Sequence, residues 1–216
     1  MSIDVPNLIL NLGISFLSAL AGAYAGTRAA TYWQQKRENQ RFESDKEATI
    51  LKAVILCRHY AQVISKIEDK ITINDRDLEW FEVNVIGISI SPSLEQDIPA
   101  LLTYLGRMNG ELVEDLIHAE WVAKSVFSVS SGRDEEYREL QKFLIEKNSP
   151  QKITKDHAIT LIGHAWAAKL ESLTKELHAA VKEGFEQNRV CHNNLLALLP
   201  ESKRIGKEQI KIEPTI

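Results

Sequence analysis

The chain has 216 residues, of which 44% are hydrophobic and 26% are charged, and its net charge is −4. This length allows one domain of ordinary size with a real core, and the composition excludes a largely disordered chain. The small negative charge gives no wholesale attraction to nucleic acid, and no arginine-rich or aromatic-basic block is present. We therefore expect no nucleic-acid partner.

The first element is an uncharged run near the N-terminus. No charged residue lies between Asp4 and Arg28. A helix of that length would extend about 34 Å, close to the hydrocarbon thickness of a bilayer. We predict a transmembrane anchor over residues 1–30, with the spanning helix at residues 5–27. The alternatives are a helix buried in a larger complex and a cleaved signal peptide, although no Lys or Arg precedes the run as a signal peptide requires.

The charges that flank this run predict its orientation. The following residues are basic, and only Glu38 opposes them: Arg28, Lys36, Arg37 and Arg41. Positive charge marks the cytoplasmic side of a membrane helix, and aromatic residues such as Tyr24, Tyr32 and Trp33 gather at the interface. We expect a single-pass protein of the cell membrane, with the N-terminus outside and most of the chain in the cytoplasm.

Small residues recur every four positions along the predicted span. They are Ser18, Gly22, Gly26 and Ala30, and the two glycines form a GxxxG pattern. Helices in lipid associate where small residues let their backbones approach closely. We predict a transmembrane association face that makes the protein a homo-oligomer. The alternative is a run of small residues that faces lipid.

A polar helical segment is expected to leave the membrane over residues 31–49. No Pro or Gly interrupts the chain from Thr27 to Asp75, so the sequence predicts one helix that continues to about Ile71. An apolar stripe with bundle spacing starts in its second half. It consists of Ile50, Val54, Cys57, Ala61, Ile64 and Ile71. We place the start of a helical-bundle domain, residues 50–199, at this stripe.

The next segment has strand-like composition. Residues 83–90 are rich in β-branched side chains, but no second strand is visible that could pair with them. We expect a buried crossover, with a short helical turn around Leu78 to Val83. If exposed, this segment would be the best candidate for binding a protein partner, through strand addition or apolar contacts. The candidate residues are Trp80, Phe81, Val83, Val85 and Ile88.

Helical patterns fill the rest of the chain. Ser91-Pro92 and Asp97-Ile98-Pro99 are typical helix starts. We expect a helix over residues 99–129 that bends or breaks near Gly106 and Gly110, a turn at residues 130–132, a short helix over 134–146 and a long helix over 154–187. A loose charged tail follows at residues 200–216. The predicted fold is all-α, an antiparallel helical bundle behind a single transmembrane helix.

Three groups of residues are candidates for chemistry. Carboxylates and a histidine cluster on one helix, at Glu111, Glu114, Asp115 and His118. Three of them, Glu111, Glu114 and His118, lie opposite its apolar face, where a solvated surface is expected instead of a metal site. A seven-residue repeat of polar groups, His157, His164, Glu171 and His178, would form a solvated stripe that alternatively senses pH or binds metal. The adjacent pair Cys191 and His192 would point about 100° apart on a helix, which disfavours a catalytic couple.

The two cysteines, Cys57 and Cys191, form no CxxC pair, which disfavours a thiolate metal cluster. We expect reduced thiols on the cytosolic side, and the alternative is an exported domain with one disulfide. No sequence motif marks a catalytic residue, a metal site or a cofactor site.

Three functions remain open from the sequence. The first is a membrane-anchored cytoplasmic helical domain that acts as a non-enzymatic interaction or oligomerisation module with an unknown protein partner. The second is an oligomerising single-pass effector of a toxin or defence type, which perturbs the bilayer. The third is a helical-bundle enzyme whose residues converge only in three dimensions, because fold alone does not determine function.

Overall fold

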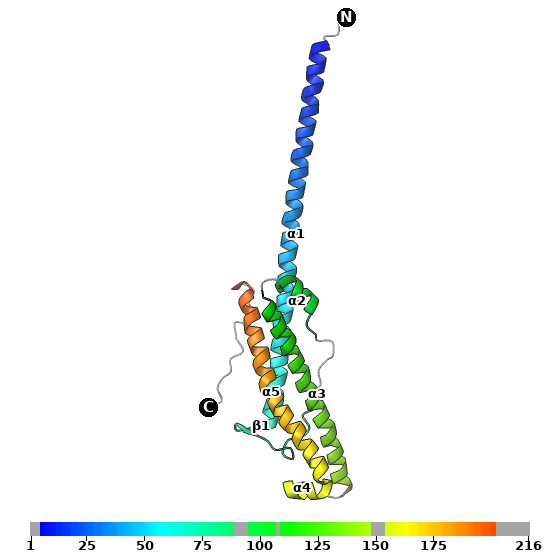
Figure 1. Ribbon diagram of the computed structural model, residues 1–216, viewed down its shortest axis with the longest axis vertical. Helices are drawn as coiled ribbons and strands as arrows, with labels where there is room; N and C mark the ends of the chain where they lie inside the picture. Colours follow the sequence, from blue (N-terminus) through cyan, green and yellow to red (C-terminus); the bar gives the residue numbers. More distant parts are fainter. Residues whose placement is uncertain (1–4, 89–94, 107–108, 148–153, 202–216) are drawn as a thin grey trace. The chain divides into compact units, whose positions relative to one another are not determined.

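A computed structural model describes residues 5–88, 95–106, 109–147 and 154–201, with the side chains of residues 5–16 left out. Five helices make up most of the described chain, so the all-α prediction is confirmed (Figure 1). The elements are α1 (Val5–Ile71), β1 (Thr72–Ile73), β2 (Arg76–Asp77), α2 (Ile98–Leu105), α3 (Gly110–Glu146), α4 (Lys155–Ile162) and α5 (His164–Leu198). The chain divides into two compact units, residues 1–47 and 48–216.

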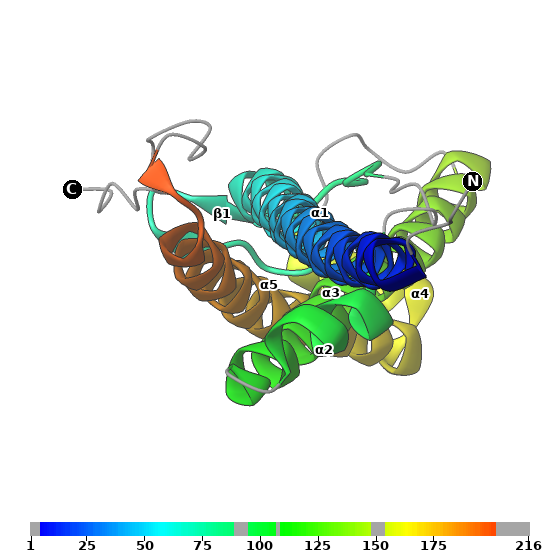
Figure 2. The same ribbon diagram turned by 90° about the horizontal axis from the view of Figure 1, so that it is seen from above.

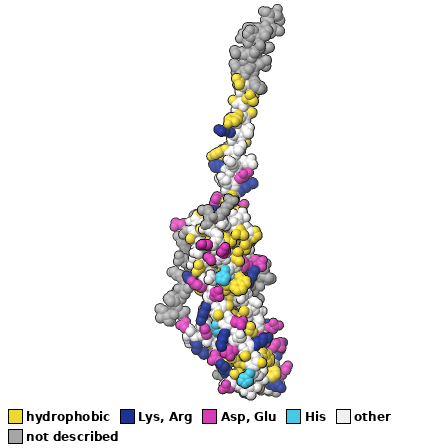
Figure 3. Space-filling view, viewed as in Figure 1, with side chains coloured by type: hydrophobic (Ala, Val, Ile, Leu, Met, Phe, Trp, Pro, Cys, Tyr) yellow, Lys and Arg dark blue, Asp and Glu magenta, His cyan; other side chains and the backbone are white. Residues whose placement is uncertain are grey.

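The first unit consists of the N-terminal part of α1. Every described side chain from Leu17 to Asp45 is exposed, including large apolar ones. Figure 3 shows hydrophobic and basic side chains on this stretch. Within the described part of the chain, no helix is both long enough and apolar enough to cross a membrane. The first half of the predicted span, up to residue 16, lies outside the described side chains.

The end of α1 is confirmed at Ile71, where an unpredicted hairpin follows. Strands β1 and β2 pair antiparallel, with Thr72 opposite Asp77. The turn residues Asn74 and Asp75 have φ angles of 49° and 57°. Two consecutive residues in the left-handed region are typical of a tight hairpin turn, and Asn and Asp tolerate this region better than most residues.

The second unit is built around residues shared by several helices. The predicted stripe of α1, from Ile50 to Ile71, is buried throughout, apart from the break at Glu68. Apart from Ala61, the residues of this stripe lie in common hydrophobic clusters with residues of α3 and α5. A Cβ atom built on Gly184 of α5 would lie 3.1 Å from Ile64 of α1 and 3.1 Å from Val126 of α3. Glycine therefore lets the three helices approach closely at this level.

The two short helices pack on the ends of the long ones. Helix α2 lies against α3, and α4 lies against α5 (Figures 1 and 2). The predicted start of α2 is confirmed, because Asp97 Oδ1 accepts a hydrogen bond from the amide of Ala100 at 3.2 Å. The predicted break between Gly106 and Gly110 is also confirmed. The second predicted helix start, Ser91-Pro92, lies outside the described residues.

Two predicted helix boundaries are wrong. Residues 130–132 are not a turn but part of α3, which runs unbroken to Glu146. Buried side chains continue along the same face through this region, at Val126, Ser130, Arg133 and Tyr137, and this packing outweighs the local turn propensity. The predicted helix over 154–187 is instead divided at Gly163, whose φ of 82° is not helical, and its second part extends to Leu198.

Candidate binding cleft

The crossover after the hairpin is held in place by one buried arginine. Arg133 of α3 is 0% exposed. Its guanidinium donates hydrogen bonds to the carbonyl oxygens of Trp80 at 3.1 Å and Asn84 at 3.0 Å, and also to that of Val83. These carbonyl groups have no sheet to pair with, so the arginine supplies the donors that a neighbouring strand would otherwise provide.

The neighbouring carboxylate completes this arrangement. Asp134 accepts hydrogen bonds from the backbone amides of Ile86 at 2.8 Å and Gly87 at 2.7 Å. Gly87 has a φ of 64°, a conformation that glycine adopts easily. Burial lowers the pKa of Arg133, and the nearby Asp134 carboxylate opposes this effect. Adjacent residues of opposite charge thus bind the carbonyl and amide groups of one crossover.

A cleft of about 560 Å³ lies between residues 77–80 and the helices α4 and α5. This volume is within the range of small-molecule sites. Four of its lining residues are buried: Leu78, Trp80, Thr174 and His178. Its other lining residues are Asp77, Glu79, Lys155, Glu171, Lys175, Ala179 and Lys182.

Ion pairs connect the two sides of the cleft. Lys155 of α4 lies 2.8 Å from Glu79, and Lys182 of α5 lies 3.2 Å from Asp77. The third lysine pairs within α5, where Lys175 lies 2.7 Å from Glu171. Because these groups are well exposed to solvent, which screens their charges, the pairs add little to stability. Their main effect is to place opposite charges at the rim of the cleft.

His178 lies between the hairpin and α5. Its Nε2 lies 3.1 Å from the carbonyl oxygen of Leu78, and its Nδ1 lies 3.5 Å from Asp77 Oδ1. A carbonyl oxygen only accepts, so Nε2 of His178 carries a proton and donates it to Leu78. Nδ1 has no hydrogen-bond partner among the described residues, and neither has Nε1 of Trp80.

The predicted partner-binding segment is largely covered. Trp80 and Val83 are buried, and Phe81, Val85 and Ile88 are half-buried. Residues 83–88 form neither helix nor strand, as expected of a buried crossover, and residues 89–90 lie outside the described residues. The predicted helical turn before them is present as a turn around residues 80–82.

The predicted association face lies open in the first unit. Ser18, Gly22, Gly26 and Ala30 are all exposed. A Cβ atom on Gly22 or Gly26 would meet nothing within 4 Å. The backbone at these two glycines is therefore accessible to another helix, which is what association through small residues requires.

The other sequence candidates do not form sites in the described residues. Glu111, Glu114, Asp115 and His118 are exposed as expected, and His118 lies 3.5 Å from Glu183 and stacks on Trp121. No group of three potential ligands that could hold a metal ion occurs in the described part of the chain. The solvated histidine stripe is wrong at His178, which is buried, and the break at Gly163 places His157 on a separate helix.

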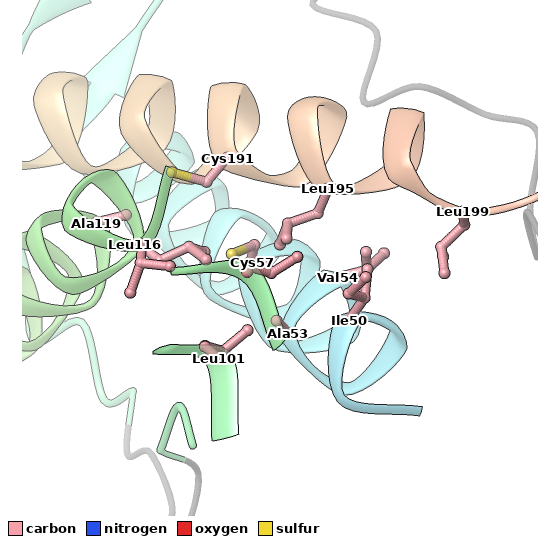
Figure 4. Packing of buried hydrophobic residues seen from close by; sticks show 12 residues of the cluster. Ile50, Ala53, Val54, Cys57, Leu101, Leu116, Ala119, Cys191, Leu195 and Leu199 are labelled. Carbon is pink, nitrogen blue, oxygen red and sulfur yellow. The ribbon is translucent and has the colours of Figure 1, made fainter. Parts of the chain in front are cut away.

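The two cysteines are free and buried in one hydrophobic cluster (Figure 4). Burial raises the pKa of the Cys191 thiol to about 12 and raises that of Cys57 further. Thiols with such raised pKa values are poor nucleophiles at neutral pH. Together with their apolar surroundings, this assigns both cysteines to packing.

Comparison of the chain with protein-family models, with curated proteins and with solved structures finds no match. The cleft therefore has to be interpreted from its own residues.

The sequence did not lead us to predict Arg133, Asp134 or Asp77 as residues of this region. The sequence does contain an indication of Arg133 and Asp134, because these two charged residues lie on the apolar face of a helix, between Val126 and Tyr137. Only the fold brings Asp77 to His178, which is 101 positions later.

Proposed function

We propose that this chain is a membrane-anchored helical domain that works by binding a protein partner. In this proposal, residues 1–30 form a single-pass anchor with the N-terminus outside, and residues 50–199 form an antiparallel helical bundle in the cytoplasm. The observation that carries the proposal is the unbroken exposure of α1 from Leu17 to Asp45. Exposed leucine, tyrosine and tryptophan on a lone helix are costly in water, so lipid or a partner is needed to cover them.

Contacts within this stretch support the proposed membrane border. Arg28 lies over the ring of Tyr24 at 5.3 Å, and Lys36 lies over that of Trp33 at 5.2 Å. Cations paired with aromatic rings are typical of the interface, where apolar bodies and charged ends are both accommodated. A border at residues 24–36 is consistent with a span that ends at Thr27.

Membrane fractionation tests the anchor directly. The full chain, expressed with a C-terminal tag, should stay with the membrane fraction after extraction with alkaline carbonate. In sealed spheroplasts, an external protease should leave the C-terminal tag intact and should remove it after lysis. Release by carbonate would contradict the anchor, and digestion of the tag before lysis would contradict the orientation.

Self-association is tested at the two glycines. Replacing Gly22 and Gly26 with leucine should reduce cross-linked oligomers, because larger side chains keep the backbones apart. The matched control is Ala21→Leu, which introduces the same side chain on a different face of the helix. Equal cross-linking of the wild type and the double variant would contradict the predicted face.

The polar side chains in the cleft favour a binding function over covalent catalysis, because they are already engaged in ion pairs and hydrogen bonds. Its three lysines are paired with carboxylates. The hydroxyl of Thr174 donates to the carbonyl of Leu170 and accepts from Arg133, so it is not available as a nucleophile. A nucleophile within reach of a base, which covalent catalysis requires, is not found among the described lining residues.

The second candidate function is an effector that perturbs the bilayer. The exposed association face of Ser18, Gly22, Gly26 and Ala30 would also allow several copies of the helix to assemble in a membrane. Conditional expression with a membrane-potential dye separates the two functions. Loss of potential on induction, abolished by Gly22→Leu with Gly26→Leu, would favour the effector. Normal growth and potential under induction would favour the interaction module.

A further inference from the structure

A short basic stretch lies between an uncharged and an acidic part of α1. Residues 17–27 carry no charge, and residues 42–47 carry three carboxylates and one lysine. Between them, residues 28–41 contain four basic residues and one acidic residue, a net charge of +3 in a chain whose net charge is −4. Positive charge is thus concentrated in this basic stretch, directly after the proposed span.

The basic side chains of this stretch are not neutralised by neighbouring carboxylates. They are Arg28, Lys36, Arg37 and Arg41. All four are exposed, and among the described residues none of them has a carboxylate within ion-pair distance. The one acidic residue, Glu38, instead accepts a hydrogen bond from Gln34 Nε2 at 2.9 Å. The positive charge is therefore available to an anionic partner.

The same four side chains are distributed around the helix. Consecutive residues of an α-helix are about 100° apart, so Arg28 and Arg37 lie about 180° apart, with Lys36 between them. A protein partner that binds a helix covers one face of it, and a helix that lies flat on a membrane has its basic residues on one face. Lipid headgroups, in contrast, surround a helix that crosses the bilayer. The arrangement therefore favours headgroups of a crossed bilayer as the partner.

The basic stretch also lies at the depth of the headgroups in the proposed topology. Arg28 directly follows the span that ends at Thr27, and Arg37 lies about 14 Å further along the helix axis. Helical side chains point toward the N-terminus, which is here the direction of the bilayer, and long basic side chains extend this reach. Screening at physiological salt leaves attraction effective over about 8–10 Å. All four charges therefore act on the headgroup layer.

The side of the helix that carries Arg37 offers a set of phosphate donors. Arg37 and Arg41 are one turn apart, and both line a shallow depression together with Trp33. Guanidinium groups match the geometry of phosphate oxygens, and an indole N–H donates as well. Trp33 is 55% exposed, and Lys36 lies over its ring at 5.2 Å. Amphipathic rings of this kind prefer the level of the headgroups.

We propose that residues 28–41 bind the headgroups of anionic phospholipids. The chain then selects anionic over zwitterionic lipid in the bilayer that it crosses. This inference rests on the proposed membrane anchor, and it names the lipid class that the anchor prefers. Each basic residue near an anionic membrane surface adds about 1 kcal/mol of attraction, which is about a fivefold change in association.

Electron paramagnetic resonance of spin-labelled lipids tests this preference in a bilayer. The full chain is reconstituted in phosphatidylcholine vesicles with a trace of phosphatidylglycerol or phosphatidylcholine that carries the label on its acyl chain. Lipids that contact the helix give a motionally restricted component, whose size measures their association. We expect phosphatidylglycerol to associate at least about threefold more strongly than phosphatidylcholine at about 0.1 M salt. At about 1 M salt, stronger screening should make the two nearly equal.

Variants test whether the basic stretch causes the preference. Arg37→Gln combined with Arg41→Gln should remove at least about half of it, because two of the four charges are lost. The matched control is Lys142→Gln combined with Lys169→Gln, which removes the same charge from the second unit. These lysines are paired with Glu139 and Glu136, so the control should keep the preference of the wild type.

The possible failures of this inference and of the anchor give different spectra. Equal association of the two labels with the wild type would overturn the lipid preference and leave the anchor intact, because the restricted component itself reports contact with lipid. An unchanged preference in the arginine variant would also overturn it, and the phosphatidylcholine component verifies that this variant is inserted. Absence of a restricted component for both labels would overturn the anchor and this inference together.

Discussion

Arg133 of α3 donates a hydrogen bond at 3.1 Å to the carbonyl oxygen of Trp80, which precedes it by 53 positions. The same guanidinium lies 4.9 Å from the ring centre of Tyr137, and its neighbour Asp134 binds the amides of Ile86 and Gly87. Backbone that lacks a strand partner is thus satisfied by two adjacent side chains of one helix. The order of residues 78–88, and of the cleft that they border, depends on this pair.

Replacing Arg133 with methionine should lower the free energy of unfolding by about 3 kcal/mol. The variant keeps an apolar side chain of similar length but leaves several carbonyl groups and Asp134 without their buried partner. Chemical denaturation measures the change. The matched control is Arg138→Met on the exposed side of α3, which should change stability by less than about 0.5 kcal/mol. Equal effects of the two variants would contradict the role of Arg133.

Gly184→Val should destabilise the second unit by about 2 kcal/mol or more. Its Cβ atom would lie only 3.1 Å from Ile64 and Val126, so three helices would have to move apart. The same substitution at Gly132, where a Cβ atom meets nothing within 4 Å, should be neutral or slightly stabilising, because valine has a better helix propensity than glycine. Thermal unfolding compares the two, and a larger loss at Gly132 would contradict this packing.

Both cysteines should resist thiol reagents in the folded protein. Burial raises the pKa of Cys191 to about 12 and that of Cys57 higher still, so almost no thiolate exists at pH 8 and neither sulfur is accessible. Reaction with Ellman's reagent should be slow in buffer and should become complete in denaturant, with two thiols titrated. Fast reaction of the folded chain, or fewer than two thiols after unfolding, would contradict buried and reduced cysteines.

His192 should make the second unit less stable in mild acid. Burial lowers its pKa from the usual 6.5, with a smaller opposing effect of the hydrogen bond to Asn193. As the pH falls below 6.5, the unfolded state takes up the proton before the folded state does, so the free energy of unfolding decreases. The contribution of His192 to the free energy of unfolding is fully present above the pKa that this residue has in the unfolded state. It is lost as the pH falls below that value and then through the lower pKa of the folded state.

Denaturation at a series of pH values measures this effect. His192→Gln should show a smaller loss of stability than the wild type between about pH 7.5 and about pH 5.5. The control His164→Gln changes an exposed histidine and should keep the pH dependence of the wild type. An unchanged pH dependence in His192→Gln would show that His192 does not titrate as its burial implies.

The long helices were predictable where spacing and burial agree. The apolar stripe of α1 from Ile50 to Ile71 is buried as predicted, and Asp97 caps α2 at the expected position. In contrast, Ser130, Ser131 and Gly132 have turn propensity but lie inside α3. A helix continues through weak residues when its flanking turns are packed, and this packing energy is not visible in a local pattern.

The cleft was not predictable in the same way. His178 follows a polar seven-residue pattern and was expected on a solvated face, whereas it is buried against Leu78 and Asp77. The hairpin that carries Asp77 is only two residues long on each strand. Contacts between residues so distant in sequence depend on how the hairpin packs against α5. A periodic pattern of apolar residues describes one helix or strand and does not predict this packing.

The sequence by itself determined the helical class, the extent of α1 and the small-residue row from Ser18 to Ala30, because helical periodicity and the lack of interrupting residues are local properties. Only the tertiary structure decided that Arg133 and Asp134 hold the crossover and that Asp77, Trp80 and His178 border one cleft. Buried polar groups need partners, and those partners come from whichever segments the packing brings within hydrogen-bond distance.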